Sequence, residues 1–158
     1  MRVKARAVIL IDGRLIVAAQ RRRGRVELSL PGGRVNRNES VLDTVKREVA
    51  EETGLEVLPG RLLYVSEIVR SVHSHDLELV FLAEASGVPR LLNGFRALDL
   101  EDADRPEVRP PILKQIVRDH ASHWRDTPRW LGNLEESGRS SGQSGHGASS
   151  GVTSDPIN

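Results

Sequence analysis

Apolar residues recur in short runs over the first hundred positions, a pattern typical of β-strands. The runs expected to form strands are Arg2 to Ile11, Arg14 to Gln20, Val26 to Leu30, Arg61 to Arg70, Leu77 to Glu84 and Phe95 to Leu100. Asp12-Gly13 separates the first two runs and suits the tight turn of a hairpin. Most of this part of the chain is therefore predicted to form β-sheet.

Two segments carry the period of a helix instead. From Glu39 to Thr53, apolar residues recur on one helical face, and Gly54 is suited to end the helix in the left-handed conformation. A second helix is expected after Pro110-Pro111, with Ile112, Leu113, Ile116 and Val117 on one face. Strands, a helix, more strands and a terminal helix predict an α/β fold in which helices cover both faces of a mixed sheet.

Length and composition limit the protein class. The chain has 158 residues, the size of one ordinary domain, and its 23 Lys and Arg nearly balance its 22 Asp and Glu. The absence of cysteine excludes disulfides, thiolate metal ligands and thiol nucleophiles. Eleven of the fifteen residues from Ser137 to Gly151 are Ser or Gly, which predicts a folded domain over 1–134 and a disordered tail over 135–158.

Three carboxylates crowd one turn of the first predicted helix. Glu48, Glu51 and Glu52 occupy positions i, i+3 and i+4, so they project from one side and repel one another. A cation between them would relieve the repulsion, and Mg²⁺ favours carboxylate oxygens completed by substrate phosphates. The pattern predicts a metal-binding helix; a solvated helix with surface ion pairs is the simpler alternative.

The flanking residues extend this helix into one long pattern. Pro31-Gly32-Gly33 precedes it, and two adjacent glycines let the backbone approach a ligand closely. Together the segment resembles the Nudix box, G-x5-E-x7-R-E-U-x-E-E-x-G-U, in which U is aliphatic. All nine defined positions are filled, by Gly33, Glu39, Arg47, Glu48, Val49, Glu51, Glu52, Gly54 and Leu55. With so many fixed positions, a chance match is far rarer than for a short glycine motif.

The resemblance implies an α/β/α sandwich and a reaction. It implies metal-dependent hydrolysis of a diphosphate bond in a nucleoside diphosphate linked to another group X. Mg²⁺ or Mn²⁺ would neutralise the phosphate oxygens and lower the pKa of the attacking water. The expected metal ligands are Glu48, Glu51, Glu52 and the Gly33 carbonyl oxygen, with Glu48 either a ligand or the general base.

Two further residues of the box are expected to support this catalytic group. By resemblance, Arg47 orients Glu48 through an ion pair. Glu39 lies near the helix start, where a carboxylate is favoured and can brace the preceding loop.

An additional acid outside the box is a common feature of this family, and the sequence leaves its position open. Glu78 and Glu84 share one face of a predicted strand and are preferred, because a strand holds a side chain more precisely than a loop. The other candidates are loop acids, namely Glu101, Asp102, Asp104 and Glu107. Among the crowded arginines before the Pro-Gly-Gly turn, Arg21 and Arg22 are weaker candidates for gripping substrate phosphate.

The expected partner is a small nucleotide, and X stays unassigned. Where ADP-ribose hydrolases often carry a proline past the box, this chain has Ser71. A non-catalytic nucleotide-binding regulator is the alternative function, although such proteins commonly have a degenerate box. Near-neutral net charge and few aromatic residues argue against a nucleic-acid groove. The apolar run Ala7 to Ile11 is too short for a signal peptide or a membrane span, so a cytoplasmic protein is expected. The sequence leaves the oligomeric state open, with a homodimer as one option.

Overall fold

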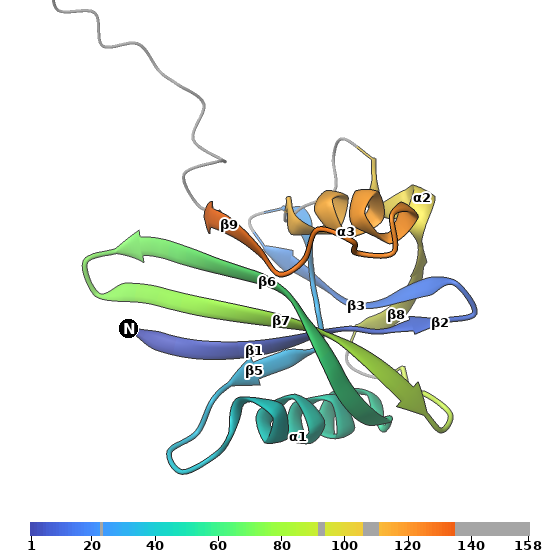
Figure 1. The fold of residues 1–158 in the computed structure, drawn as a ribbon, viewed down its shortest axis with the longest axis horizontal. Helices are drawn as coiled ribbons and strands as arrows, with labels where there is room; N and C mark the ends of the chain where they lie inside the picture. Colours follow the sequence, from blue (N-terminus) through green and yellow to red (C-terminus); the bar gives the residue numbers. More distant parts are fainter. Residues whose placement is uncertain (23, 92–93, 106–110, 135–158) are drawn as a thin grey trace, which may run out of the picture.

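The computed structural model describes residues 1–22, 24–91, 94–105 and 111–134 (Figure 1). The predicted tail over 135–158 and the candidate acid Glu107 lie outside these residues, as does the side chain of Arg22. In chain order the elements are β1 (Arg2–Val8), β2 (Leu10–Ile11), β3 (Arg14–Arg22), β4 (Arg25–Ser29), β5 (Gly32–Arg34), α1 (Val41–Thr53), β6 (Glu56–Ser71), β7 (Ser74–Ser86), β8 (Phe95–Asp99), α2 (Leu100–Ala103), α3 (Ile112–Ala121) and β9 (Arg129–Asn133).

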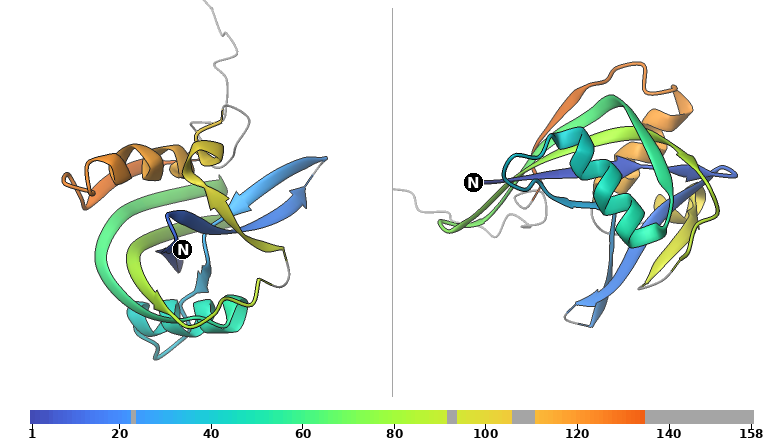
Figure 2. Two further views of the ribbon diagram at one scale, coloured as in Figure 1. Left: turned by 90° about the vertical axis from the view of Figure 1, so that its right-hand side faces the viewer. Right: turned by 90° about the horizontal axis from the view of Figure 1, so that it is seen from below.

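Two sheets organise these strands. One has the order β5-β1-β7-β6-β9 and is mixed, because β1 runs parallel to β7 and β9 parallel to β6. The other joins β2, β3 and β4, with β8 added along β3. Figure 2 shows α1 and α3 on opposite sides of the curved strands β6 and β7, which confirms the predicted α/β architecture with a mixed sheet.

The alternation of side chains along β1 divides the core between the two helices. Ala5 and Ala7 belong to a buried cluster that includes Val45 and Val49 of α1. Val8 belongs to the other cluster, with residues of α3. Each fully buried Val or Leu side chain contributes roughly 1.5–3 kcal/mol relative to exposure. Burial of Val45 and Val49 therefore holds α1 on the sheet, with the acidic residues of the helix outside the buried cluster.

The predicted hairpin after β2 is confirmed, with positive φ angles at both turn residues, Asp12 (50°) and Gly13 (74°). The hairpin of β6 and β7 is longer than expected. Ser74 to Asp76 lies before the expected strand start at Leu77 but belongs to β7, because cross-strand bonds and ion pairs outweigh its low strand propensity.

Three short elements were not predicted from the sequence. β5 contains two glycines and forms only because it pairs with β1, while β9 depends on a parallel partner far away in the sequence. α2 replaces the expected loop at Glu101. Each of them owes its conformation to tertiary pairing or packing rather than to local propensity.

Candidate active site

Both ends of α1 are capped as its sequence favours. The helix begins at Val41, two residues after the predicted start at Glu39; Ser40 is its N-cap, and the Ser40 Oγ accepts a hydrogen bond from the Asp43 N–H at 3.1 Å. Gly54 closes the other end with a φ of 72°, as predicted. The two caps fix where α1 begins and ends, and so they fix the position of its acidic residues beside β5. We call the charged residues of this site the box cluster: Glu39, Arg47, Glu48, Glu51 and Glu52.

Arg47 is the centre of the box cluster. Its guanidinium pairs with Glu39 through two bonds, Nε to Oε1 at 2.7 Å and Nη2 to Oε2 at 3.0 Å. Its Nη1 donates to Glu48 Oε1 at 2.9 Å and lies 3.5 Å from Glu51 Oε2. The structure thus brings Arg47 and Glu48 together as expected. It also places the Glu51 carboxylate beside the Arg47 guanidinium.

The bond network also fixes the charge states of these residues. Hydrogen bonds from Arg47 and the Asn36 N–H lower the pKa of Glu39 to about 2, against a smaller opposing effect of burial. In turn, the hydrogen bonds of Arg47 to Glu39 and, to a smaller extent, to Glu48 raise the pKa of Arg47. Glu39 and Arg47 consequently form a permanent ion pair that braces the start of α1 against the loop after β5.

The double glycine allows the backbone to reach the acids. Gly32 has a φ of 133° and its missing Cβ would overlap the carbonyl oxygen of Ala5, so no other residue fits there. At Gly33, a Cβ would collide with the carboxylate of Glu48. The Gly32 N–H donates to Glu52 Oε2 at 2.9 Å. Both glycines therefore allow β5 to contact α1 directly.

Glu52 is the most perturbed acid of the box cluster. Burial raises its pKa to about 7, and the charges of Glu48 and Glu51 act in the same direction. The Gly32 N–H and the charge of Arg6 oppose the rise. Even with Glu52 partly protonated at neutral pH, the ionised acids of the box cluster outnumber its one arginine.

Arg6 was not predicted as a site residue. Its Nη1 donates to the carbonyl oxygens of Gly32 at 2.8 Å and Leu30 at 3.2 Å, and its Nη2 lies 3.5 Å from Glu78 Oε1. The signal in the sequence is the alternation Arg2-Val3-Lys4-Ala5-Arg6-Ala7, which places three cations on one face of a strand. Arg6 thereby holds the start of β5 in the position from which the Gly32 N–H contacts Glu52.

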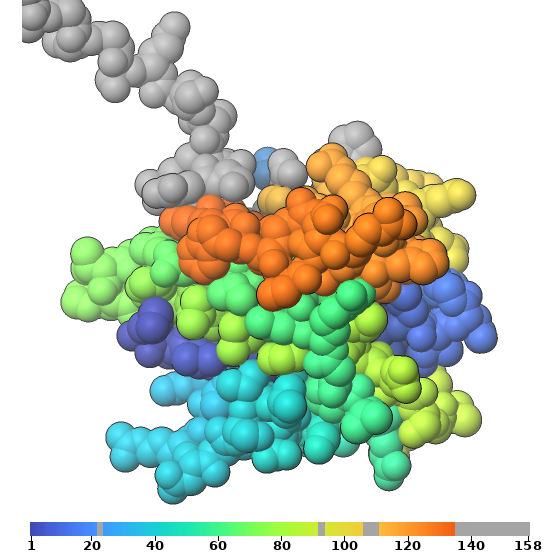
Figure 3. Space-filling model, in the orientation of Figure 1, coloured from blue at the N-terminus to red at the C-terminus, as the bar shows by residue number. Residues whose placement is uncertain are grey.

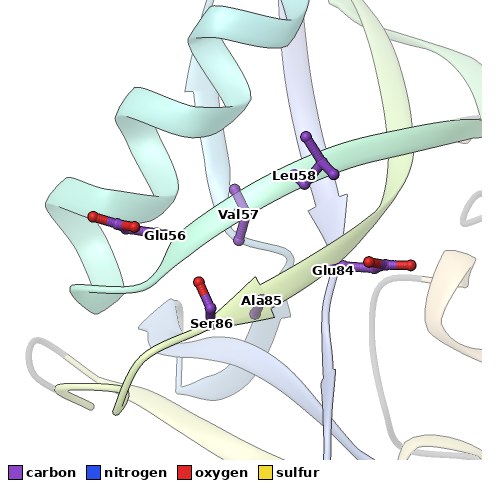
Figure 4. Close-up of a pocket in the computed structure, with 6 residues that line it drawn as sticks. All are labelled: Glu56, Val57, Leu58, Glu84, Ala85 and Ser86. Atoms are coloured by element: carbon purple, nitrogen blue, oxygen red, sulfur yellow. The ribbon is translucent and has the colours of Figure 1, made fainter.

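The candidate additional acids lie in different surroundings. The Glu78 side chain is 12% exposed and connects to the turn through Arg6. Glu84 lines a surface hollow of ≈ 320 Å³ instead, and Figure 4 shows its side chain extending away from α1. Asp102 pairs with Arg105 at 2.7 Å, and Glu101 and Asp104 are exposed. Arg21 is exposed on β3.

The donor chemistry of the site fits a hard divalent ion. Glu48 and Glu51 already turn toward one positive charge, Arg47 Nη1, and carboxylate oxygens are the donors that Mg²⁺ prefers. Across the described residues, no three His, Asp or Glu side chains are gathered closely enough to form a ready metal centre. Glu48, Glu51 and Glu52 of α1 are the side chains that could hold such an ion.

This combination of fold and acid-rich helix defines a Nudix-type hydrolase. The family model of the NUDIX domain matches residues 1–119, and the chain belongs to that family. The expected fold and enzyme class, a Nudix-type pyrophosphohydrolase, are thereby confirmed.

Several solved structures are similar to this chain. A MutT NUDIX hydrolase from Burkholderia pseudomallei is 28% identical over 74% of this chain and 95% of its own, with a TM-score of 0.61. A NUDIX hydrolase from Nitrosomonas europaea is 25% identical, covering 78% and 90%, with a TM-score of 0.64. An ADP-ribose pyrophosphatase from Streptococcus suis shares the fold at 22% identity, covering 84% and 97%, with a TM-score of 0.56. No protein of curated function matches the sequence.

Within the described part of the chain, no helix is both long enough and apolar enough to cross a membrane.

Proposed function

We propose that this protein hydrolyses a diphosphate bond in a nucleoside diphosphate linked to a group X, with Mg²⁺ or Mn²⁺ as cofactor. The observation that carries the proposal is the excess of acids in the box cluster, where Glu39, Glu48 and Glu51 contact one arginine and Glu52 adds a fourth carboxyl group beside Gly32. A diphosphate is itself anionic, so substrate can approach this site only with a divalent ion present. The small nucleotide substrate and the cytoplasmic location are parts of the same proposal.

Glu48, Glu51, Glu52 and the Gly33 carbonyl oxygen would hold the ion. When bound, it would neutralise phosphate oxygens and lower the pKa of the attacking water. The chain's own residues supply the rest. The Arg47–Glu39 ion pair fixes α1 relative to the loop before it, and Arg6 orients the start of β5 at Gly32.

Glu48 can serve as a ligand or as the general base, and its contacts are compatible with both roles. Its carboxylate is 19% exposed, lies against Gly33 and receives one hydrogen bond from Arg47. That bond orients the carboxylate through Oε1, while its second oxygen is left for a ligand or a proton.

A turnover screen tests the proposal. The purified protein is incubated with Mg²⁺ or Mn²⁺ and nucleoside diphosphate sugars, ADP-ribose, dinucleoside polyphosphates, NADH, and canonical and oxidised nucleoside triphosphates. Resolved products identify X and the bond that is broken. Cleavage that requires the metal supports the proposal. Silence across the panel, in a folded sample that still binds nucleotide, would favour the regulator instead.

A further inference from the structure

The last turn of α1 carries acids at the end where a helix favours cations. Glu51 and Glu52 both lie in this turn, and it contains no basic residue. The C-terminal end of a helix has a partial negative charge, because its last carbonyl groups have no partner within the helix. Two of the proposed metal ligands are therefore held by the turn whose own sequence stabilises it least.

A residue from another segment closes this end of α1. The Arg90 N–H donates to the carbonyl oxygen of Thr53 at 2.7 Å, so it satisfies one of the terminal carbonyl groups. The Arg90 guanidinium lies against Gly54, since a Cβ built on this glycine would be 2.7 Å from Arg90 Nε and 3.3 Å from Nη2. The chain after β7 thus supplies the cation that the last turn lacks.

The register of β6 and β7 brings Arg90 to this position. β6 begins at Glu56, two residues after Gly54, and Glu56 pairs with Ser86 at the end of β7. Arg90 follows four residues later and contacts the end of α1. In Figures 1 and 3 the chain after β7, drawn in yellow-green, lies beside the C-terminal end of α1.

Backbone and hydroxyl contacts hold the same turn without the Arg90 side chain. The Gly54 N–H donates to the Ala50 carbonyl oxygen at 2.9 Å, and Thr53 Oγ1 donates to the Val49 carbonyl oxygen at 2.7 Å. Arg90 is exposed, so its truncation would not leave a cavity in the core. A substitution that removes only the guanidinium should therefore loosen the last turn and leave the domain folded.

We propose that Arg90 is a positioning residue, which holds the last turn of α1, and with it Glu51 and Glu52, in the arrangement that binds the metal ion. The inference rests on the proposed function and deepens it, because Glu51 and Glu52 act as ligands only if the site holds a metal. Arg90 acts through the backbone of α1 and not as a ligand.

Amide hydrogen exchange of the metal-free protein tests the effect on the helix. Arg90→Gln keeps the backbone N–H, so the amides of residues 52–54 should exchange about threefold faster, the scale of one charge at a helix end. The amides of residues 45–48 should exchange as in wild type. Arg125→Gln makes the same change in net charge between α3 and β9, on the other side of the sheet from α1, and should leave exchange in α1 unchanged (Figure 2).

Calorimetric titration with Mn²⁺ alone separates positioning from a simple charge effect. Arg90→Gln should weaken Mn²⁺ binding about threefold, because the last turn no longer holds its two ligands in place. Loss of a repelling cation near an acidic site would tighten the binding instead, so the two roles predict opposite signs. Arg90→Lys keeps a cation at the helix end and should bind Mn²⁺ within about twofold of wild type. Arg125→Gln should bind like wild type.

The outcomes distinguish the proposal from the proposed function. A merely structural contact would lower the melting temperature of Arg90→Gln and leave its Mn²⁺ affinity unchanged. Equal amide exchange at the end of α1 in Arg90→Gln and wild type, or Mn²⁺ binding that is equal or tighter in the variant, would overturn the positioning role alone. Failure of the wild type to bind Mn²⁺ would overturn the metal site itself, and with it the assignment of Arg90.

Discussion

The box cluster and the group around Asp76 on β7, which we call the Asp76 cluster (Asp76, Arg2, Lys4 and Arg70), have opposite charge patterns. In the box cluster three acids, Glu39, Glu48 and Glu51, contact one arginine; in the Asp76 cluster three cations contact one acid. In each, the central ion orients the charged side chains around it. The comparison teaches that an ion pair network can orient charged groups for a ligand as well as stabilise a fold.

The two central ions differ in burial, and this changes what each contributes. Arg47 is 30% exposed, so water screens its pairs and each is worth little for stability. Asp76 is fully buried, so loss of its partners would leave a desolvated charge. We therefore expect substitutions in the box cluster to change activity and substitution of Asp76 to change stability.

The largest effect is expected for Glu52→Gln. Loss of this ligand charge should reduce metal-dependent turnover at least about a hundredfold, whereas folding without metal should be unchanged or slightly favoured because repulsion is relieved. Steady-state kinetics and thermal melting measure both. Glu56→Gln, exposed and outside the box, is the matched control. Turnover within about threefold of wild type would show that Glu52 is not a ligand.

Asp76→Asn should have the largest effect on stability. The folded pKa of about 2 lies below the ordinary value of 3.8, so the ionised carboxylate stabilises the fold by about 2 kcal/mol at neutral pH. Urea unfolding at pH 7 should show a loss of this size. Glu84→Gln, exposed on the same strand, should unfold like wild type.

The pH dependence of the stability difference between wild type and Asp76→Asn supplies its own control. Because the folded pKa is lowered, the contribution is present above pH 3.8 and disappears as the pH falls through about 2. Wild type and Asp76→Asn should therefore converge in stability between pH 4 and pH 2. A difference that persisted at pH 2 would mean that packing, not charge, accounts for the loss.

Without bound metal, ionisation of Glu52 should destabilise the fold. This effect on stability is opposite in sign to that of Asp76 and smaller. Its folded pKa of about 7 lies above the ordinary 4.5, so its ionisation destabilises the metal-free fold above pH 7 and the penalty fades toward pH 4.5. In a chelating buffer, stability should rise by about 1 kcal/mol from pH 8 to pH 6. The rise should be absent from Glu52→Gln, measured by urea unfolding in the same buffers.

The box was predictable from the sequence because its residues are close along the chain and its helix has a clear apolar stripe. Arg47 and Glu51 are four positions apart in α1, so helical geometry alone brings them together, and Glu39 lies in the short loop directly before the helix. The Asp76 cluster was not predicted, because its members are joined only by the register of β1 against β7. Arg6 was missed for the same reason, since the pairing of β1 with β5 sets its contact with Gly32.

Glu78 lies between the two clusters and gives the smallest expected effect. It pairs across the sheet with Lys4 and contacts Arg6, so Glu78→Gln should loosen Arg6 and lower kcat about threefold, the size of one partly exposed ion pair. Glu84→Gln should leave kcat unchanged, because Glu84 extends away from α1. The pH–rate profile distinguishes the alternatives. A loss near a hundredfold together with a flattened acidic limb would make Glu78 the general base, whereas loss of that limb only in Glu48→Gln would place the base within the box.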